Sequence, residues 1–136
     1  MKKLLAVLLV ALTLAACGNK AVTTKGSFQS EADEQGNYTT AEVTLVDGKI
    51  TEVVIDEFYA ANDTTKKTLG ADYGMAAFSS IGKEWFEQVE AVEAWCVGKT
   101  GEEVFNGPAA EELKSSCTIY YGHLLQAVAA ACEAAK

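Results

Sequence analysis

Three patterns of hydrophobic and polar positions divide the chain. The first is an apolar run over residues 4–14, interrupted only by Thr13. The second, between residues 26 and 58, consists of short alternating segments rich in β-branched and aromatic side chains. The third, from residue 83 onward, repeats apolar side chains every three or four positions, which is typical of amphipathic helices. Strands followed by helices predict an α+β domain, with an antiparallel sheet of about three or more strands packed against two main helices.

The clearest strand signal is a hairpin. Residues 40–45 alternate strictly, and one face of this segment holds Ala41, Val43 and Leu45. Asp47-Gly48 follows, and this pair favours a tight turn because glycine readily adopts the positive φ that the turn requires. The return strand is expected over residues 50–58, with apolar side chains on both faces. A third strand is expected over residues 26–32, followed by a turn at residues 35–37.

Two helices are expected in the second half of the chain. The first helix is expected over residues 83–97. Its buried side would carry Trp85, Val89, Val92 and Cys96, and its solvent-facing side would carry Glu87, Glu90 and Glu93. Gly98 is a natural stop. Thr100 would cap a short helical turn, and Gly107-Pro108 would break the chain. In the last helix, residues 122–135, the buried side would hold Leu124, Leu125, Val128 and Cys132.

The N-terminal run is typical of a secretory signal. Lys2 and Lys3 precede it, and it is too short to span a bilayer stably. Leu14-Ala15-Ala16-Cys17 resembles the bacterial lipobox, which predicts cleavage before Cys17 and lipidation of that cysteine. An ordinary cleaved signal beside a buried cysteine is the alternative.

We therefore expect a signal peptide over 1–16, a lipidated flexible tether over 17–24 and a folded domain over 25–136. The protein would be held to a membrane of the bacterial envelope through acylated Cys17 and face outside the cytoplasm. Cleavage removes two lysines and no acids, so the net charge changes from −8 to −10. Such acidity argues against nucleic acid as a partner.

Three cysteines remain after Cys17, namely Cys96, Cys117 and Cys132. All three lie in apolar sequence surroundings, so we expect them to be buried and to act as small hydrophobic side chains. The alternative is a single disulfide, with Cys96 as a possible partner. His123 is the only histidine, and no CxxC pair is present, so no metal site is expected.

No pattern in the sequence establishes an enzyme, and no catalytic residue is assigned. Gly98-Lys99-Thr100 resembles the end of a P-loop, but Glu93 stands where its first glycine belongs, so Lys99 is interpreted as a cation at a helix end. No serine lies in a GxSxG pattern, so His123 is interpreted as a surface or rim histidine. Asp56 and Glu57 are neighbours on a strand and should point to opposite faces.

Two segments are candidates for binding. Residues 59–81 form a long irregular connection that contains Tyr73-Gly74-Met75, and such connections often line sites. Residues 113–119 carry Ser115, Ser116 and Thr118 and would join a strand to the last helix. The amides at that helix start could cradle a phosphate, or the hydroxyls could simply cap the helix.

Several of these segments together resemble the bacterial FMN-binding domain. The resemblance is carried by Lys25-Gly26-Ser27-Phe28, by residues 41–45 and by the hairpin over residues 46–53, and it covers most of residues 25–135. Members of that family include membrane-anchored lipoproteins and subunits of respiratory complexes. Their Ser/Thr-Gly-Ala-Thr motif corresponds here to Ser115-Ser116-Cys117-Thr118, so glycine and alanine are replaced, and the acid expected before the motif is missing.

The resemblance implies FMN as the cofactor. Its phosphate would lie on Ser115, Ser116 and Thr118 and its ring against Tyr73, Met75 or Trp95, and the altered motif favours non-covalent over covalent binding at Thr118. The implied function is electron transfer by bound flavin, with a membrane redox partner. The alternative is a lipoprotein without flavin that binds another ligand or makes surface interactions.

Overall fold

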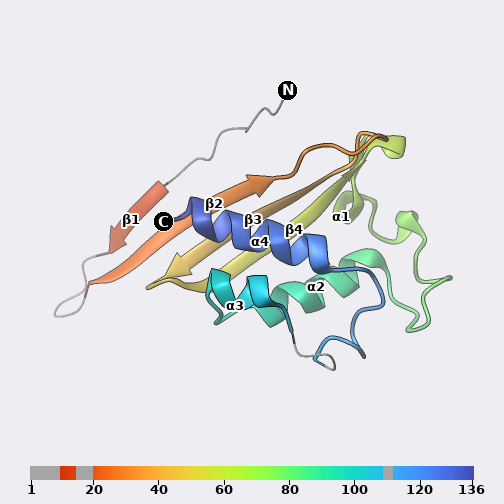
Figure 1. The fold of residues 1–136 in the computed structure, drawn as a ribbon. Coiled ribbons are helices and arrows are strands. Elements are labelled where there is room, and N and C mark those ends of the chain that lie inside the picture. The colour runs from red at the N-terminus through yellow and green to blue at the C-terminus, as the bar shows by residue number, and fades with distance from the viewer. Residues whose placement is uncertain (1–9, 15–19, 109–111) are drawn as a thin grey trace.

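The structure is a computed structural model that describes residues 10–14, 20–108 and 112–136, with only the backbone of 10–14. Cys17, most of the expected signal peptide and residues 17–19 of the expected tether lie outside the described residues. Figure 1 shows a sheet with helices packed along it, which confirms the predicted α+β class.

The sheet is antiparallel, and its strands lie side by side in chain order. They are β1 (Val10–Leu14), β2 (Ala21–Gln29), β3 (Tyr38–Val46), β4 (Lys49–Tyr59) and β5 (Thr64–Thr65). The helices are α1 (Lys66–Leu69), α2 (Trp85–Cys96), α3 (Gly101–Asn106) and α4 (Gly122–Ala134), with short 3-10 turns at η1 (Ala60–Asn62) and η2 (Gly70–Tyr73). The first part of the connection expected to be irregular, residues 60–73, is therefore a series of short elements, while residues 74–81 contain no helix or strand.

The predicted hairpin is confirmed, and its turn has the expected chemistry. Asp47 and Gly48 have φ values of 50° and 81°, so both central residues are left-handed, as a two-residue turn of this kind requires. The register shifts between Thr44 and Leu45, which pair with Glu52 and Ile50. This bulge at Thr51 reverses the alternation of β4, so that Ile50 and Ile55 both face the helices. The bulge accounts for Ile50, whereas Val54 and Phe58 lie on the face of β4 opposite Ile55.

The third strand is present but begins and ends earlier than predicted. Residues 21–24, assigned to a flexible tether, belong to β2, so that prediction is wrong for them. Thr23 and Thr24 pair with Val46 and Leu45 at the end of the hairpin, and their β-branched side chains suit a strand. The connection after β2 is held by Asp33, whose Oδ1 accepts from the amides of Gln35 and Asn37, both at 2.9 Å.

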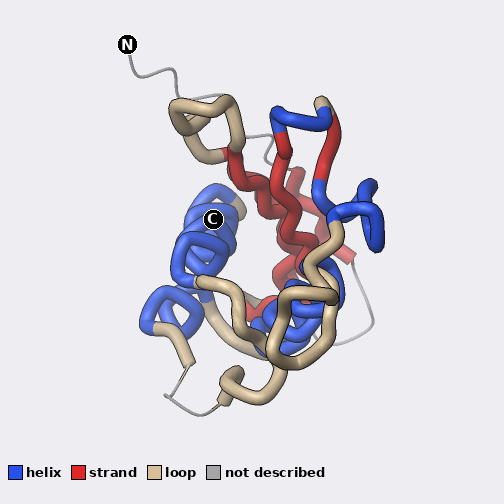
Figure 2. The backbone as a smooth tube through the Cα atoms, turned by 90° about the vertical axis from the view of Figure 1, so that its right-hand side faces the viewer, coloured by secondary structure: helices blue, strands red, loops and turns tan. Residues whose placement is uncertain are grey.

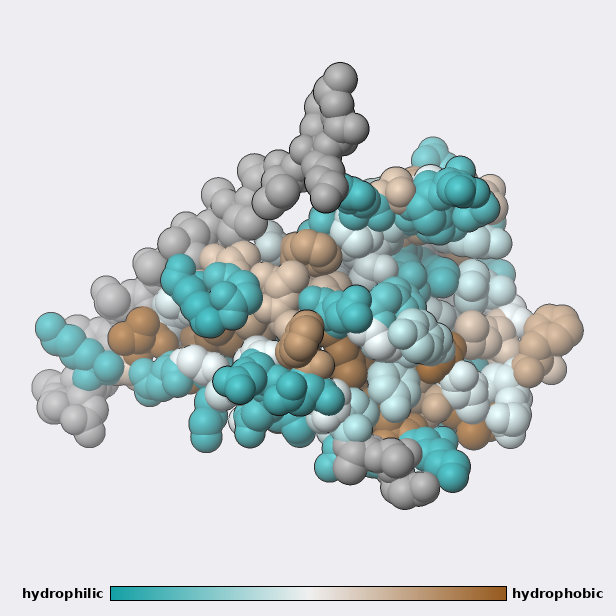
Figure 3. Space-filling model, viewed as in Figure 1, coloured by the Kyte–Doolittle hydropathy of each residue, from teal (hydrophilic) through white to brown (hydrophobic). Residues whose placement is uncertain are grey.

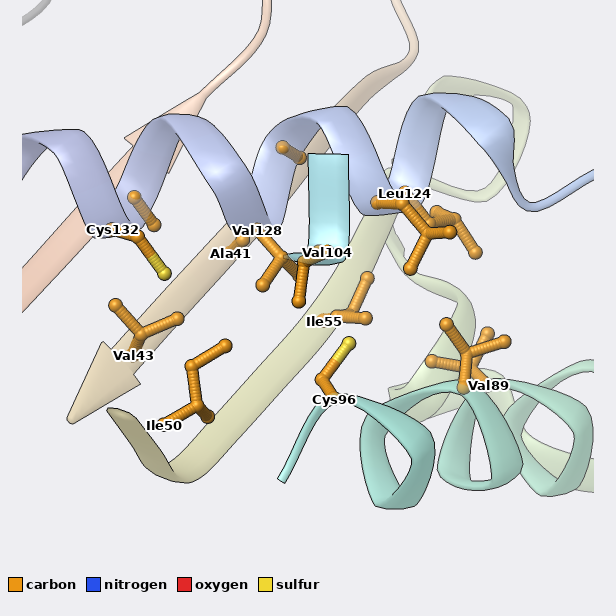
Figure 4. Close-up of a cluster of buried hydrophobic side chains, with 14 of the residues drawn as sticks. Ala41, Val43, Ile50, Ile55, Val89, Cys96, Val104, Leu124, Val128 and Cys132 are labelled. Carbon is orange, nitrogen blue, oxygen red and sulfur yellow. The ribbon is translucent and has the colours of Figure 1, made fainter. Parts of the chain in front are cut away.

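The helices form one layer on one face of the sheet. Figures 1 and 2 show α4 lying along β2 and β3, with α2 near β4 and α3 beside α4. Figure 4 shows side chains from both layers meeting in one core, including Ala41, Val43, Ile50, Ile55, Val89, Cys96, Val104, Leu124, Val128 and Cys132. The buried stripes predicted for both long helices are confirmed.

Close packing of α4 against β2 depends on Gly26. A Cβ at this position would lie 2.1 Å from the carbonyl oxygen of Ala131, so any larger residue would push the helix away. The short helix α3 begins as predicted, because Thr100 Oγ1 accepts from the amide of Glu103 at 3.3 Å. The cysteines Cys96, Cys117 and Cys132 are buried and unpaired, which confirms their interpretation as small hydrophobic side chains.

On the face of the molecule drawn in Figure 3, the described apolar residues lie at separate places. Hydrophilic residues lie between them. Among the side chains that the structure describes, the exposed large hydrophobic ones are Val22, Val54, Phe78, Val97, Phe105 and Tyr120. Within the described part of the chain, no helix is both long and apolar enough to cross a membrane.

Candidate functional site

Two regions contain the residues with binding chemistry, and the first is organised by Gln88. This side chain on α2 is completely buried. Its Oε1 accepts hydrogen bonds from the amide of Thr118 at 2.7 Å, the hydroxyl of Thr118 at 3.1 Å and the amide of Ile119 at 3.2 Å. Its Nε2 donates to Lys83 O at 3.1 Å and to Ser79 Oγ at 3.3 Å. We call this region the Gln88 corner.

The Gln88 corner brings together two of the residues predicted to bind a ligand. Met75 Sδ lies 3.6 Å from Gln88 Nε2, on the opposite side of the amide from Thr118. Ser79 Oγ and Thr118 Oγ1 are 3.4 Å apart. The long connection and the hydroxyl-rich segment therefore meet, as a shared site would require.

Other predicted residues do not join this corner. Tyr73, in η2, is half-buried and packs edge-on against Tyr59. Ser115 is exposed, and within the described chain neither its hydroxyl nor that of Ser116 makes a hydrogen bond to the corner. Trp95 lies seven residues beyond Gln88 on the same helix, about 10 Å along its axis. Its indole donates to Glu112 at 2.7 Å instead.

The segment before α4 matches neither prediction made for it, a phosphate cradle or a side-chain cap of the helix. It is a turn rather than the end of a strand. The amides of Thr118 and Ile119 are taken by Gln88, and that of Ser116 donates to Leu113 O at 3.1 Å, so these groups do not form an open phosphate cradle. The hydroxyls do not cap the helix either, because its N-cap residue is Tyr121 and no side chain caps it.

The second region is a pocket of about 390 Å³ between the connection after β2, the end of β4 and the start of α4. Its walls include Phe28, Tyr38, Thr39, Glu57, His123 and Gln126. We call it the Glu57 pocket. It is built from three segments that are far apart in the sequence.

Glu57 is the half-buried charge of this pocket, with a side chain 14% exposed. Its Oε1 accepts from Lys66 Nζ at 3.2 Å. Its Oε2 lies 3.3 Å from His123 Nε2 and 3.4 Å from Thr39 Oγ1. Burial by itself raises the pKa of Glu57, but the hydrogen bond with His123 and the charge of Lys66 hold the pKa below the usual 4.5. The carboxylate is therefore ionised at neutral pH.

His123 stands at the rim of the pocket, as its sequence position suggested. Its side chain is 41% exposed, and its ring stacks on Tyr120 with centroids 5.6 Å apart. Asp56 is directed elsewhere, since its Oδ1 accepts from the amide of Lys67 at 3.1 Å. The sequence did not reveal the contact between Glu57 and His123, because 66 positions separate them and no short pattern links them.

Two further charged residues, Glu93 on α2 and Lys99 just beyond its C-terminus, make polar contacts that hold α2 in place. Glu93 was expected to face water, and this is wrong. It is half-buried, and its Oε2 accepts from the amide of Ile55 and from Lys67 Nζ, both at 2.7 Å. Lys99 is a cation at the helix end as predicted, because its Nζ donates to Trp95 O at 2.6 Å and lies over the Trp95 ring.

Comparisons with known proteins leave the family open. The chain matches no model of a protein family, and neither a curated protein nor a solved structure is found to match it. The resemblance to the FMN-binding domain thus depends on the residues quoted above. Among the described residues, no group of three or more His, Cys, Asp or Glu side chains is placed to hold a metal ion.

Proposed function

We propose that this protein is a lipid-anchored extracytoplasmic protein of the bacterial envelope whose α+β domain binds a small ligand in the Glu57 pocket. The anchor is supported by the charged start, the apolar run and the lipobox-like Leu14-Ala15-Ala16-Cys17. The binding function is supported above all by one observation, a pocket of about 390 Å³ with a half-buried carboxylate, that of Glu57, in its wall.

The pocket has the features of a site that is formed before its ligand arrives. Glu57 is held by three donors, and Thr39, which is buried, holds one edge of the carboxylate. Phe28 and Ala127 add an apolar wall beside these polar groups. A few oriented polar groups in a largely apolar cleft are the usual composition of small-molecule sites.

The proposal is tested with residues 17–136 carrying Cys17→Ser, screened by thermal denaturation against small molecules of different charge. We expect at least one compound to raise the melting temperature, because a ligand that binds only the folded state stabilises it. The effect should be reduced in Glu57→Gln and kept in the control Glu133→Gln, which changes an exposed acid on α4. A screen in which no compound stabilises the protein contradicts the proposal.

Flavin binding at the Gln88 corner is the second candidate, favoured by the meeting of Met75 and Thr118 around one buried amide. Bound FMN would supply one- and two-electron transfer. The ring would lie near Met75, because Tyr73 packs on Tyr59 outside this corner. The phosphate would depend on the hydroxyls of Ser115, Ser116 and Thr118, because the amides of Thr118 and Ile119 do not fit that role while Gln88 holds them.

An absorption spectrum and an intact mass separate the two candidates. A yellow protein with flavin bands would favour the flavoprotein, and an added mass of FMN lost in Thr118→Ala would show covalent attachment. A colourless protein that FMN does not stabilise would exclude it. That result would leave ligand binding at the Glu57 pocket as the function.

A further inference from the structure

We infer that the Glu57 pocket selects small organic cations, in particular an ammonium group attached to an apolar chain or ring. This inference rests on the proposed function, since it names the class of ligand for the same pocket. It follows from the charge of the lining, from the acceptors still available there and from the apolar wall beside them.

The lining carries an excess of negative charge. Three carboxylates, Glu31, Asp33 and Glu57, line the pocket, and the described lining includes no lysine or arginine. Lys66 pairs with Glu57 and offsets one of the three charges. The remaining field, from the exposed Glu31 and Asp33 at the mouth of the pocket, attracts a cation and opposes an anion.

Acceptor positions remain for a donor from the ligand. An ionised carboxylate offers about four lone-pair positions. Glu57 uses three of them, for Lys66, His123 and Thr39. Asp33 uses three for its turn, accepting from Gln35 and Asn37. Glu31 is exposed, and none of its carboxylate oxygens accepts a hydrogen bond within the described chain. An ammonium group, with three donors and no acceptor, matches this set.

The other wall suits the apolar part of such a ligand. Phe28 and Tyr38 line the pocket together with Ala127. Tyr38 borders the pocket only at its edge, because it alternates with the inward-facing Thr39 and its ring stacks on Phe58 on the other face of the sheet, with centroids 4.9 Å apart. Phe28 is the aromatic residue on the same face as Glu57, and because the face of an aromatic ring attracts cations, it adds to the preference for an ammonium group.

Three probes of nearly equal shape test the charge preference: phenethylammonium, 2-phenylethanol and 3-phenylpropionate. Each is titrated at constant ionic strength into residues 17–136 with Cys17→Ser, and binding is measured by calorimetry and by the shift in melting temperature. We expect phenethylammonium to bind at least tenfold more tightly than the alcohol, and phenylpropionate to bind least.

Two matched variants locate the site. Gln126 is exposed at the wall of the pocket, and Gln126→Lys adds a positive charge there. Thr51 is also exposed but lies outside the lining, six residues and about 20 Å along β4 from Glu57, so Thr51→Lys adds the same charge far from the pocket. We expect at least a tenfold loss of phenethylammonium affinity in Gln126→Lys and less than a twofold change in Thr51→Lys.

The outcomes distinguish the inference from the proposed function. If the alcohol or the acid binds as tightly as the ammonium compound, the pocket binds ligands without selecting cations. This result would contradict the cation preference but not the proposed function. The inference also falls if both lysine variants weaken binding equally, since the acidic surface as a whole would then be responsible. If neither these probes nor any compound of the screen binds, both the cation preference and the proposed function are contradicted.

Discussion

Two polar side chains, the buried Gln88 and the half-buried Glu57, join distant segments of this protein. Gln88 ties the loop before α2 to the segment before α4, and Glu57 ties β4 to α1 and α4. A buried polar group is costly unless its hydrogen bonds are made, so each of these residues stabilises the fold only while its partners stay in place. The consequences at this scale can be measured with single substitutions.

Replacing Gln88 should destabilise the fold although the volume is nearly kept. Gln88→Leu removes the acceptor for the amides of Thr118 and Ile119, and we expect a loss of roughly 1–3 kcal/mol in the free energy of unfolding. Urea denaturation measures this loss. The matched control is Gln126→Leu at an exposed position, where a change within about 0.5 kcal/mol is expected. Equal stability of the two variants would contradict the role given to Gln88.

The cysteines of the core should be unreactive in the folded protein. Burial raises the pKa of Cys96 to about 12 and that of Cys132 to about 11, and it also raises the pKa of Cys117. Because the thiolate is the reactive form, iodoacetamide at about pH 8 should label the folded Cys17→Ser protein slowly and all three thiols rapidly in urea. Intact mass follows the labelling. Rapid modification of the folded protein would show that the core opens.

Glu57 should make stability depend on pH in the acid range. Its folded-state pKa lies below the ordinary 4.5, so the unfolded chain takes up this proton at the higher pH. The stabilisation is complete above about pH 4.5 and is lost as the pH falls through the lower folded-state value. The difference in urea midpoint between the parent and Glu57→Gln should therefore shrink on acidification. A constant difference across this range would contradict an ionised Glu57.

At the scale of elements, the two edges of the sheet differ. The outer edge of β4 is occupied along its length, because Ile50 exchanges backbone hydrogen bonds with Gly98 and Lys99, Ile55 donates to Glu93, and Tyr59 pairs with β5. On the opposite side β1 pairs with β2 and is the outermost strand. The helices pack on β2, β3 and β4. Cleavage before Cys17 would remove β1 and leave this helix-covered unit intact.

The contact between α4 and β2 should be sensitive to a single methyl group. Gly26→Ala would place its Cβ against the backbone of Ala131, and we expect a loss of roughly 1–3 kcal/mol in the free energy of unfolding, as for overpacked cores. Ser27→Ala, at the next position of the strand and on its other face, should change stability by less than about 0.5 kcal/mol. Thermal and urea denaturation measure both. A neutral Gly26→Ala would mean that α4 can shift without cost.

At the scale of the whole molecule, the anchor determines where the domain acts. The acyl chains expected on Cys17 would each contribute about 0.8 kcal/mol per buried methylene, and one chain alone holds a protein only marginally. We expect the exported protein to fractionate with membranes and to carry the added mass of lipid, and Cys17→Ser to lose both. If the two proteins fractionate alike and neither carries lipid, the anchoring proposal is wrong.

Local chemistry determined most of the elements. Asp47-Gly48 specified the hairpin turn, Thr100 the start of α3, and the spacing of Trp85, Val89 and Val92 the buried side of α2. Each of these signals lies within one or two turns of chain, where backbone conformation and side-chain periodicity act directly. Where the prediction failed, as at Glu93, a distant partner had intervened.

By itself, the sequence determined the fold class, the hairpin, the two long helices and the burial of the cysteines, because these follow from periodicity and turn chemistry along the chain. Only the tertiary structure decided which polar groups meet. Gln88 and Thr118 are 30 positions apart, and Glu57 and His123 are 66 apart. Their contacts arise when α2 and α4 pack on the sheet, and no local pattern in the chain encodes that packing geometry.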